Sequence, residues 1–432
     1  MISKDFAKRR NKLLRKIEDK SAIFIFSETQ KFRNNDVAYD FRQSSNFYYL
    51  TGINDPSTVL FILKDGKVTT TTLVCKRPND LDKLWNGQVP SKLSYKKHLD
   101  IENIIYFDEL NTLKLGNIKN LYFEFKDEKR LDDILKKVNL TDTKSRYHKN
   151  NDLHSTRSNL SSLIFDMRRI KSKGELSEIR HAAKISANAH VNLIKTCKPG
   201  MKEFEIEAEF IEFCMKNQCK QAYPAIVASG KNACILHYTK NSSTLNPDTL
   251  LLVDAAAEYN NYASDITRTI PVSGKFTEHQ KLIYELVLKS QQKAIEACKP
   301  GKTLVDIHNV AVRNITKGLI KLKILKGSLD KNIKEGKYKK YFMHNTGHWL
   351  GLDVHDPSSY AYDGEPIKLK PGMVFTVEPG IYISNDSDLE RGFHNIGVRI
   401  EDDIVITRNG CEVLSKDVPK SVMEIEKLMS HA

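Results

Sequence analysis

Apolar residues cluster in short runs along the first part of the chain. Four runs are rich in β-branched and aromatic residues, as strands are: 21-SAIFIFS-27, 47-FYYLTG-52, 57-STVLFILKDG-66 and 68-VTTTTLVCK-76. Shorter helical patterns lie between them. Because strand-like runs and helical patterns alternate in this way, the sequence predicts an α/β domain over residues 1–165.

A polar segment without a period follows. The run 148-HKNNDLHSTRSNLSSL-163 indicates a linker or a domain edge. After it, Ser172 and Glu175 have the spacing of a capping box, and apolar residues then recur at helical steps until Pro199. The pattern predicts that a second domain occupies residues 172–432.

The second domain repeats its own plan. A further capping box, Thr277 with Gln280, opens a helix that ends in 298-CKPG-301, as the first helix ends in 197-CKPG-200. Each stop leads into another helical segment. A duplicated unit explains why the order of helix, stop and helix occurs twice.

The repeat extends to the strands. The run 247-PDTLLLVD-254 aligns with 371-PGMVFTVE-378 without a gap, so Asp254 in one repeat stands where Glu378 stands in the other. A duplicated unit of this kind predicts a pseudo-twofold axis. Such an axis would bring the two carboxylates together.

A hairpin pattern places a third carboxylate beside them. In 254-DAAAEYNNYASD-265, Asn260 and Asn261 suit a two-residue turn, which puts Asp254 and Asp265 on the same face of the ribbon. Like charges so close repel one another. Either that face is solvated, or a cation lies between the two carboxylates.

Further candidates for such a site come later. The run 397-GVRIEDDIVIT-407 reads as one strand, and Glu401 follows its apolar alternation, which is costly for an acid unless it is paired or bound to a metal. The run 344-HNTGHWLGLDVHD-356 adds His344, His348 and His355. A helical HxxxH zinc site is disfavoured there, because no Glu follows the first histidine and a glycine interrupts the pattern.

Composition limits the setting. The 68 basic and 54 acidic residues give a net charge of +14, but the lysines are dispersed and form no arginine–aromatic cluster, so we expect no nucleic-acid partner. Seven cysteines without CxxC spacing fit reduced thiols in the cytoplasm. The charged amino-terminal segment has no apolar core, which disfavours export, and no apolar run predicts a membrane span.

At this point the chain resembles a known family. From Asp36 to its end it is similar to aminopeptidase P, the Xaa-Pro aminopeptidase group of the pita-bread metallopeptidases. The matching runs are 39-YDFRQSSNFYYLTG-52, 234-CILHYT-239, 254–265 with the following ITRT, 348-HWLGLDVHD-356, 374-VFTVEPGIYI-383 and 398-VRIEDDIVIT-407. The resemblance implies an α+β fold: a pita-bread catalytic domain behind a smaller α/β domain concerned with substrate access and oligomer contacts.

The resemblance also implies two divalent metal ions per chain. The family's ligand positions are filled by Asp254, Asp265, His348, Glu378 and Glu401. Asp265 and Glu401 would bridge the ions, Asp254 would complete one site, and His348 with Glu378 the other. This oxygen-rich set suits Mn²⁺, with Co²⁺, Fe²⁺ or Zn²⁺ as alternatives. Four carboxylates roughly balance two such ions, which would relieve the repulsion in the hairpin.

The implied activity is removal of an amino-terminal residue that precedes proline, by a metal-bridging hydroxide. Glu378 would handle the proton of the attacking water, while His237 and His355 would act on the substrate and on the charge of the tetrahedral intermediate. The expected substrate-binding positions are His237, His344, His355, Tyr382 and Arg399.

Contacts between subunits are a further implication. Asp36 and Trp85 match positions that reach a neighbouring subunit's active site in this family, so we expect a homo-oligomer, a dimer or a tetramer. Two segments depart from the family pattern, since 83-KLWNGQVPS-91 and 361-AYDGEPIKLKP-371 lack the expected arginines. Both departures bear on substrate preference and on subunit contacts.

Three other functions share this fold. A prolidase would use the same ligands on Xaa-Pro dipeptides, but Trp349 and the run 39–52 favour the aminopeptidase. A non-catalytic binding module is disfavoured, because such modules have lost ligands and here all five positions are filled. Creatinase-like, metal-free chemistry is disfavoured by the same argument.

Overall fold

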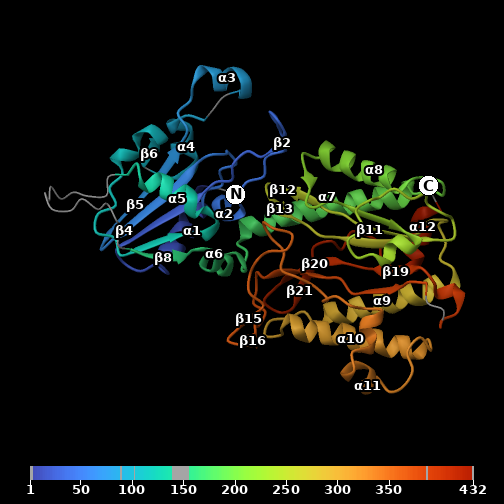
Figure 1. Cartoon of the computed structure of the whole chain (residues 1–432). Coiled ribbons are helices and arrows are strands. Elements are labelled where there is room, and N and C mark those ends of the chain that lie inside the picture. The colour runs from blue at the N-terminus through green and yellow to red at the C-terminus, as the bar shows by residue number, and fades with distance from the viewer. Residues whose placement is uncertain (1–2, 88–89, 102, 139–154, 386–387, 431–432) are drawn as a thin grey trace. The chain divides into compact units, whose positions relative to one another are not determined.

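The computed structural model describes residues 3–87, 90–101, 103–138, 155–385 and 388–430 (Figure 1). The chain divides into two compact units, Met1–Arg168 and Arg169–Ala432.

The first unit is built on a six-stranded mixed sheet in the order β6-β5-β4-β1-β7-β8. Its strands are β1 (Ser21–Phe26), β4 (Val59–Asp65), β5 (Val68–Cys75), β6 (Asn103–Tyr106), β7 (Asn120–Phe123) and β8 (Thr156–Asn159). β1 is buried along its whole length, between β4, with which it runs antiparallel, and β7, with which it runs parallel. Its continuous apolar sequence follows from this central place.

Helices and one small hairpin complete the first unit. The helices are α1 (Ser3–Leu14), α2 (Ser45–Thr51), α3 (Asp80–Asn86), α4 (Lys92–Leu99), α5 (Glu128–Leu135) and α6 (Ser161–Arg168), and the hairpin is β2 (Phe32–Asn34) with β3 (Val37–Ala38). Apolar side chains of the sheet and of α5 share one core. The predicted strands at 21–27, 57–66 and 68–76 are confirmed as β1, β4 and β5.

Two predictions for this part of the chain were wrong in part. The run 47–52 is not a strand but most of helix α2, which buries Phe47 and Leu50 on one face and ends at Gly52 with a φ of 67°. Helical spacing of the buried residues overrode the strand preference of the aromatic ones. The predicted linker lies outside the described residues up to 154, but beyond it the chain forms β8 and begins α6.

Among its described residues, the second unit holds three three-stranded antiparallel sheets and two two-stranded ribbons. The sheets have the orders β10-β11-β14, β13-β12-β9 and β17-β20-β21, and the ribbons are β18 with β19 and β15 with β16. Their bounds are β10 (Ile226–Ser229), β11 (Leu250–Asp254), β14 (Thr267–Pro271), β17 (Val374–Val377), β18 (Gly380–Ile383), β19 (Ile396–Arg399), β20 (Asp402–Ile406) and β21 (Cys411–Val413). The bounds of the shorter strands are β9 (Lys220–Gln221), β12 (Ala257–Tyr259), β13 (Tyr262–Ala263), β15 (Ala361–Tyr362) and β16 (Glu365–Pro366).

Long helices carry the rest of this unit (Figure 1). They are α7 (Lys173–Thr196), α8 (Glu203–Lys216), α9 (Glu278–Glu296), α10 (Leu304–Lys321), α11 (Leu329–Lys334) and α12 (Val422–Met429). One apolar core joins the helices α7, α8, α9 and α10 with strands of the β10-β11-β14 and β17-β20-β21 sheets. Within the described part of the chain, no helix combines the length and the hydropathy that crossing a membrane requires.

The repeated plan is present in this unit. Capping boxes open α7 at Ser172 and α9 at Thr277, and a second long helix follows each of them. In one half β11 pairs antiparallel with β14, and in the other β17 pairs antiparallel with β20. The duplicated pita-bread architecture that the sequence predicts is therefore confirmed.

The predicted hairpin is also confirmed, and with it the shared face of two aspartates. Asn260 and Asn261 have φ values of 48° and 64°, as a two-residue turn of this hand requires. Asp254 pairs with Thr267, so Asp265 lies diagonal to Asp254 on the same face.

The run 397–407 was predicted as one strand, and this was wrong. It forms β19 and β20, which pair with different partners, and Glu401 lies at the break between them. Because the strand is interrupted at Glu401, this side chain does not have to follow the apolar alternation of β19 or β20.

Candidate metal centre

Strand ends place the carboxylates of the second unit. Asp254 is the last residue of β11, Glu378 directly follows β17, and Glu401 directly precedes β20. His348 is held beside β17 by two bonds with Thr376: its N–H donates to the hydroxyl at 3.1 Å, and its carbonyl accepts from the N–H at 3.0 Å. The segment 344–348 is not helical, which excludes the helical HxxxH zinc site.

These side chains line one cavity of about 530 Å³. It contains all five ligand positions that the resemblance implied, Asp254, Asp265, His348, Glu378 and Glu401, together with His237, His344, His355 and Arg399. Its other lining residues are Tyr223, Pro224, Ile226, Leu236, Thr239, Asn345, Gly347, Val354 and Tyr360.

Ligand atoms of three residues already converge. One atom each from Asp265, His348 and Glu401 can be chosen so that all lie within 4.8 Å of one another. The Nε2 atom of His348 is 3.3 Å from Oδ2 of Asp265 and 3.7 Å from Oε1 of Glu378. Such spacing suits ligands around a shared cation, because each donor lies about 2 Å from a bound divalent ion.

Burial and mutual repulsion raise the pKa values of Glu378, Glu401 and Asp254. Burial is the main cause for Glu378, whose pKa rises to about 7, and for Glu401, whose pKa rises well above its ordinary value with help from the Asp265 charge. Burial also raises the pKa of Asp254, although Arg399 opposes it. For His348 burial would lower the pKa, but the bond to Asp265 and the charge of Glu378 raise it to about 9. Carboxylates under this repulsion fit a site for cations.

The donor set fits divalent metal ions on a second ground. The phenol oxygen of Tyr223 lies 2.6 Å from Oδ1 of Asp254 and 2.5 Å from Oδ1 of Asp265. A phenol has one hydrogen and can donate to only one of them. The two aspartates therefore retain acceptor capacity that hard cations satisfy.

Arg399 links Asp254 to His344 through the hydroxyl of Tyr382. Its Nη2 donates to Oδ2 of Asp254 at 2.6 Å, and its Nη1 donates to the hydroxyl of Tyr382 at 3.0 Å. That hydroxyl lies 2.8 Å from Nε2 of His344. Burial lowers the pKa of His344 to about 4, so its imidazole is neutral at neutral pH; its Nδ1 donates to the carbonyl of Asn345 at 2.7 Å, and its Nε2 therefore accepts from the Tyr382 hydroxyl.

The two remaining histidines are exposed and border the open part of the cavity. The ring of His355 meets that of His348 edge to face at 4.3 Å, and burial together with the His348 charge lowers its pKa. His237 lines the cavity and makes no hydrogen bond to any residue that the structure describes. Both imidazoles are therefore available to a substrate.

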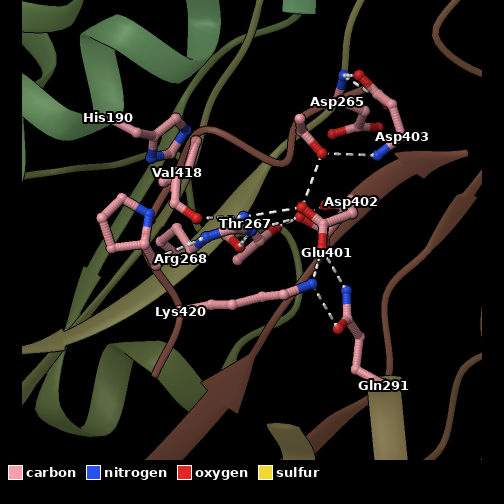
Figure 2. A network of polar contacts seen from close by, with 12 residues as sticks. His190, Asp265, Thr267, Arg268, Gln291, Glu401, Asp402, Asp403, Val418 and Lys420 are labelled. Carbon is pink, nitrogen blue, oxygen red and sulfur yellow. Dashed lines mark hydrogen bonds and ion pairs between the residues drawn. The ribbon is translucent and has the colours of Figure 1, made fainter. Parts of the chain in front are cut away.

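A buried charge network supports the acids from behind (Figure 2). Arg268 donates to the carbonyl of Glu401 at 2.6 Å and to Asp402 at 2.8 Å, and Asp402 also accepts from Lys420 at 2.5 Å. On the next residue, Asp403 accepts from the N–H of Asp265 at 3.1 Å. The network fixes the main chain at two of the ligand positions.

Three residues singled out in the sequence lie elsewhere. Asp36 and Trp85 belong to the first unit, where both side chains are exposed, Trp85 to 79%. Trp349 is buried to 1% exposure and stacks on Tyr360, so it supports the wall of the cavity but does not line it.

Sequence reasoning missed several residues of the site. Tyr223 precedes Pro224 outside any periodic run, so no signal marked it. Thr267, whose hydroxyl donates to Oε2 of Glu401 at 2.6 Å, could have been found from its place two residues after Asp265 on the same face. Asp402 and Asp403 were visible as acids beside Glu401, but their partners were not.

Two segments of the chain match known families. Residues 177–408 match metallopeptidase family M24, and residues 6–121 match the aminopeptidase P amino-terminal domain.

Full-length relatives agree with these matches. The chain is 39% identical over 429 residues to an Xaa-Pro aminopeptidase of Haemophilus influenzae, covering 99% of this chain and 97% of that protein. It is 37% identical to an Xaa-Pro aminopeptidase of Escherichia coli K12, covering 98% and 97%.

Solved structures give the same result. The aminopeptidase PepP of Pseudomonas aeruginosa superposes with a TM-score of 0.94 at 37% identity, covering 100% of this chain and 98% of that one. Aminopeptidase P of E. coli with the inhibitor Pro-Leu superposes with a TM-score of 0.93 at 36% identity, covering 100% and 99%. The chain belongs to metallopeptidase family M24. Within that family, its amino-terminal match and its full-length relatives assign it to the aminopeptidase P group.

Proposed function

We infer that the chain is a metal-dependent Xaa-Pro aminopeptidase, which hydrolyses the bond between an amino-terminal residue and a following proline. One observation carries this: the four carboxylates and the imidazole meet in a single cavity of a chain that resembles Xaa-Pro aminopeptidases over its full length.

We propose that Asp254, Asp265, His348, Glu378 and Glu401 hold two divalent ions, most readily Mn²⁺. Four carboxylates match the charge of two such ions, and oxygen donors favour hard cations. A solved relative, E. coli aminopeptidase P, has been zinc-substituted, which supports Zn²⁺ as an alternative here; carboxylates with an imidazole also suit Co²⁺ and Fe²⁺. Bound ions would lower the pKa of a water and polarise the scissile carbonyl.

The chain's own residues divide the remaining work. Glu378 would take the proton of the attacking water, because its carboxylate lines the cavity, 3.7 Å from Nε2 of His348. His237 and His355 line the cavity with exposed side chains, and they would donate to the oxygen on which charge develops. Tyr382, Arg399 and His344 form a bonded chain that holds Asp254; Arg399 and His344 line the cavity and would contact the peptide, whereas Tyr382 is buried behind them.

Proline preference follows from the shape of this pocket. The peptide bond before proline has no N–H that a peptidase could bind. A site that packs flat imidazole rings against the pyrrolidine ring instead gains contacts that alanine cannot supply. Losing that burial costs about 1–3 kcal/mol, or about 10–200-fold in kcat/KM.

The test compares peptide lengths. At matched Mn²⁺, the enzyme should release Phe from Phe-Pro-Ala at least as efficiently as from Phe-Pro, since an aminopeptidase leaves the far end of the substrate open. Cleavage of the dipeptide alone would make the protein a prolidase instead.

Assembly and location are proposals that rest on the first unit and on the cysteines. We propose a homo-oligomer, a dimer or tetramer, in which the exposed Asp36 and Trp85 approach a neighbouring subunit's cavity. The seven cysteines are all free thiols in the structure, which supports a cytoplasmic location. Sedimentation of wild-type protein beside Trp85→Ala tests the first point, because an unchanged oligomer with unchanged activity would remove that role for Trp85.

A further inference from the structure

A buried carboxylate outside the metal centre gathers one loop of the cavity wall. Glu203, the first residue of α8, is fully buried. Its Oε1 accepts from the N–H and the hydroxyl of Ser229 at 2.8 and 2.7 Å, and from Nδ2 of Asn232 at 3.0 Å. Its Oε2 accepts from the hydroxyl of Tyr238 and from the N–H of Ser243, both at 2.8 Å. One side chain thus receives five hydrogen bonds.

This carboxylate is held by neutral donors. Among the described residues, no lysine or arginine forms an ion pair with Glu203, which instead lies at the positive end of the α8 dipole. Burial alone would raise its pKa, but the bonds from Asn232, Ser243 and Ser229 outweigh burial and lower the pKa. The group is therefore an anion at neutral pH, and its five bonds are of the strong, charge-assisted kind.

The partners of Glu203 span one continuous segment, residues 229–243, which we call the substrate loop. They lie at its start, in its middle and at its end. The same loop carries Leu236, His237 and Thr239 on the wall of the cavity. Glu203 therefore holds the backbone on both sides of the residues that face the substrate, and Asn241 adds bonds from the end of the loop to Glu207 and to the carbonyl of Ala225.

His237 depends on this anchor. No described residue bonds its imidazole, so the position of the ring is set by the backbone of the loop. Its neighbour Tyr238 points the other way, bonds Glu203, and packs in an apolar cluster with Ile226, Ala228, Ala233, Leu252 and Tyr382.

We propose that Glu203 is a positioning residue for the substrate: through the substrate loop it sets where His237 meets the peptide. The proposal rests on the proposed function only for the role of His237, because the coupling of Glu203 to the loop is visible in the contacts themselves.

Glu203→Gln is the direct test, since the amide keeps the shape but cannot accept on its nitrogen. At least two of the five donors then lose their acceptor. Glu205→Gln is the matched control: it removes the same charge from the same turn of α8, but Glu205 bonds only the N–H of Lys202 and not the loop.

Kinetics and metal content separate positioning from folding. We expect Glu203→Gln to lower kcat/KM for Phe-Pro-Ala about tenfold, and less than about twofold when His237 is already alanine, because the two act as a unit. Elemental analysis should find the wild-type metal content in both Gln variants. Equal losses in the two backgrounds, or loss of metal, would overturn the proposal.

Hydrogen exchange gives a readout that needs no peptidase activity. Peptides covering 235–240 should exchange faster in Glu203→Gln than in Glu205→Gln, while peptides of β11 and β14 should not change. Unchanged exchange at 235–240 overturns the proposal whatever the substrate proves to be. If wild-type protein fails to cleave Phe-Pro-Ala, the proposed function is wrong. Hydrogen exchange at 235–240 still tests whether Glu203 holds the substrate loop.

A second, more conservative variant tests the same contact in case Glu203→Gln does not fold. Tyr238→Phe removes one donor and keeps the ring in its cluster, so it should show the same exchange pattern and a smaller kinetic loss, about threefold. A Tyr238→Phe enzyme with wild-type exchange and wild-type kcat/KM would contradict the role of the loop anchor.

Discussion

Arg268→Met tests the buried network behind the metal centre. Arg268 is 1% exposed and donates to Asp402 at 2.8 Å, to the carbonyl of Thr267 at 2.9 Å and to the carbonyl of Glu401 at 2.6 Å. Methionine keeps the bulk but removes these three donors, so that Asp402 retains Lys420 as its remaining cationic partner. Removing one partner of a buried ion pair costs about 3–5 kcal/mol of stability. We therefore expect Arg268→Met to lower the free energy of unfolding by about 3–5 kcal/mol.

The pKa of Asp402 gives a second, independent measure of what this network contributes to the free energy of unfolding. Burial would raise it, but Arg268 and Lys420 lower it from 3.8 to about 2. A depressed pKa means stability that is present above pH 4 and is lost as the pH falls through 2, here about 2 kcal/mol. In Arg268→Met the folded-state pKa of Asp402 should rise, so less of that acid-labile stability remains.

The assay uses the two tryptophans, one in each unit. In a Trp85→Phe background, urea unfolding followed by fluorescence reports Trp349, which is buried in the second unit. Arg180→Met is the control, because the Arg180–Glu412 pair is exposed and should contribute about 0–1 kcal/mol. If Arg268→Met costs no more than this control, the network does not hold the site.

Three further predictions follow from the same geometry. Asp265→Ala or Glu401→Ala should abolish activity and lower the metal content, whereas His355→Ala should keep the metal and lower kcat; the reverse pattern of metal loss would contradict these roles. Replacing proline by alanine in Phe-Pro-Ala should lower kcat/KM about 10–200-fold, and equal rates would exclude a pyrrolidine pocket. In chelated protein the free energy of unfolding of the wild type, relative to that of Glu378→Gln, should fall by about 3 kcal/mol between pH 4.5 and 7, since a raised folded-state pKa makes the folded protein bind more protons than the unfolded one; a difference between the two proteins that stays constant or rises over this range in urea unfolding would refute the assignment.

Much of the site was visible in the sequence because its acids sit at strand ends of a repeated unit. Two-residue periodicity put Asp254 and Asp265 on one face, and the gapless match of 247–254 with 371–378 brought in Glu378. These signals are local or follow from symmetry, so one chain is enough to read them.

What escaped the sequence depends on contacts between distant segments. Tyr223 meets two aspartates, and Lys420 meets Asp402, only after the sheets have packed. Helix α2 was mistaken for a strand because seven residues give too short a window to separate a helical from a strand period. Glu203 reads as an ordinary first-turn acid until the loop folds onto it.

Metal titration of chelated protein tests the central claim most directly. With Phe-Pro-Ala as substrate and bound Mn²⁺ counted by elemental analysis, release of Phe should be absent without metal and should reach its full rate as two ions bind per chain. The five side chains that meet in the cavity predict that stoichiometry. Full activity in the chelated protein would contradict the account.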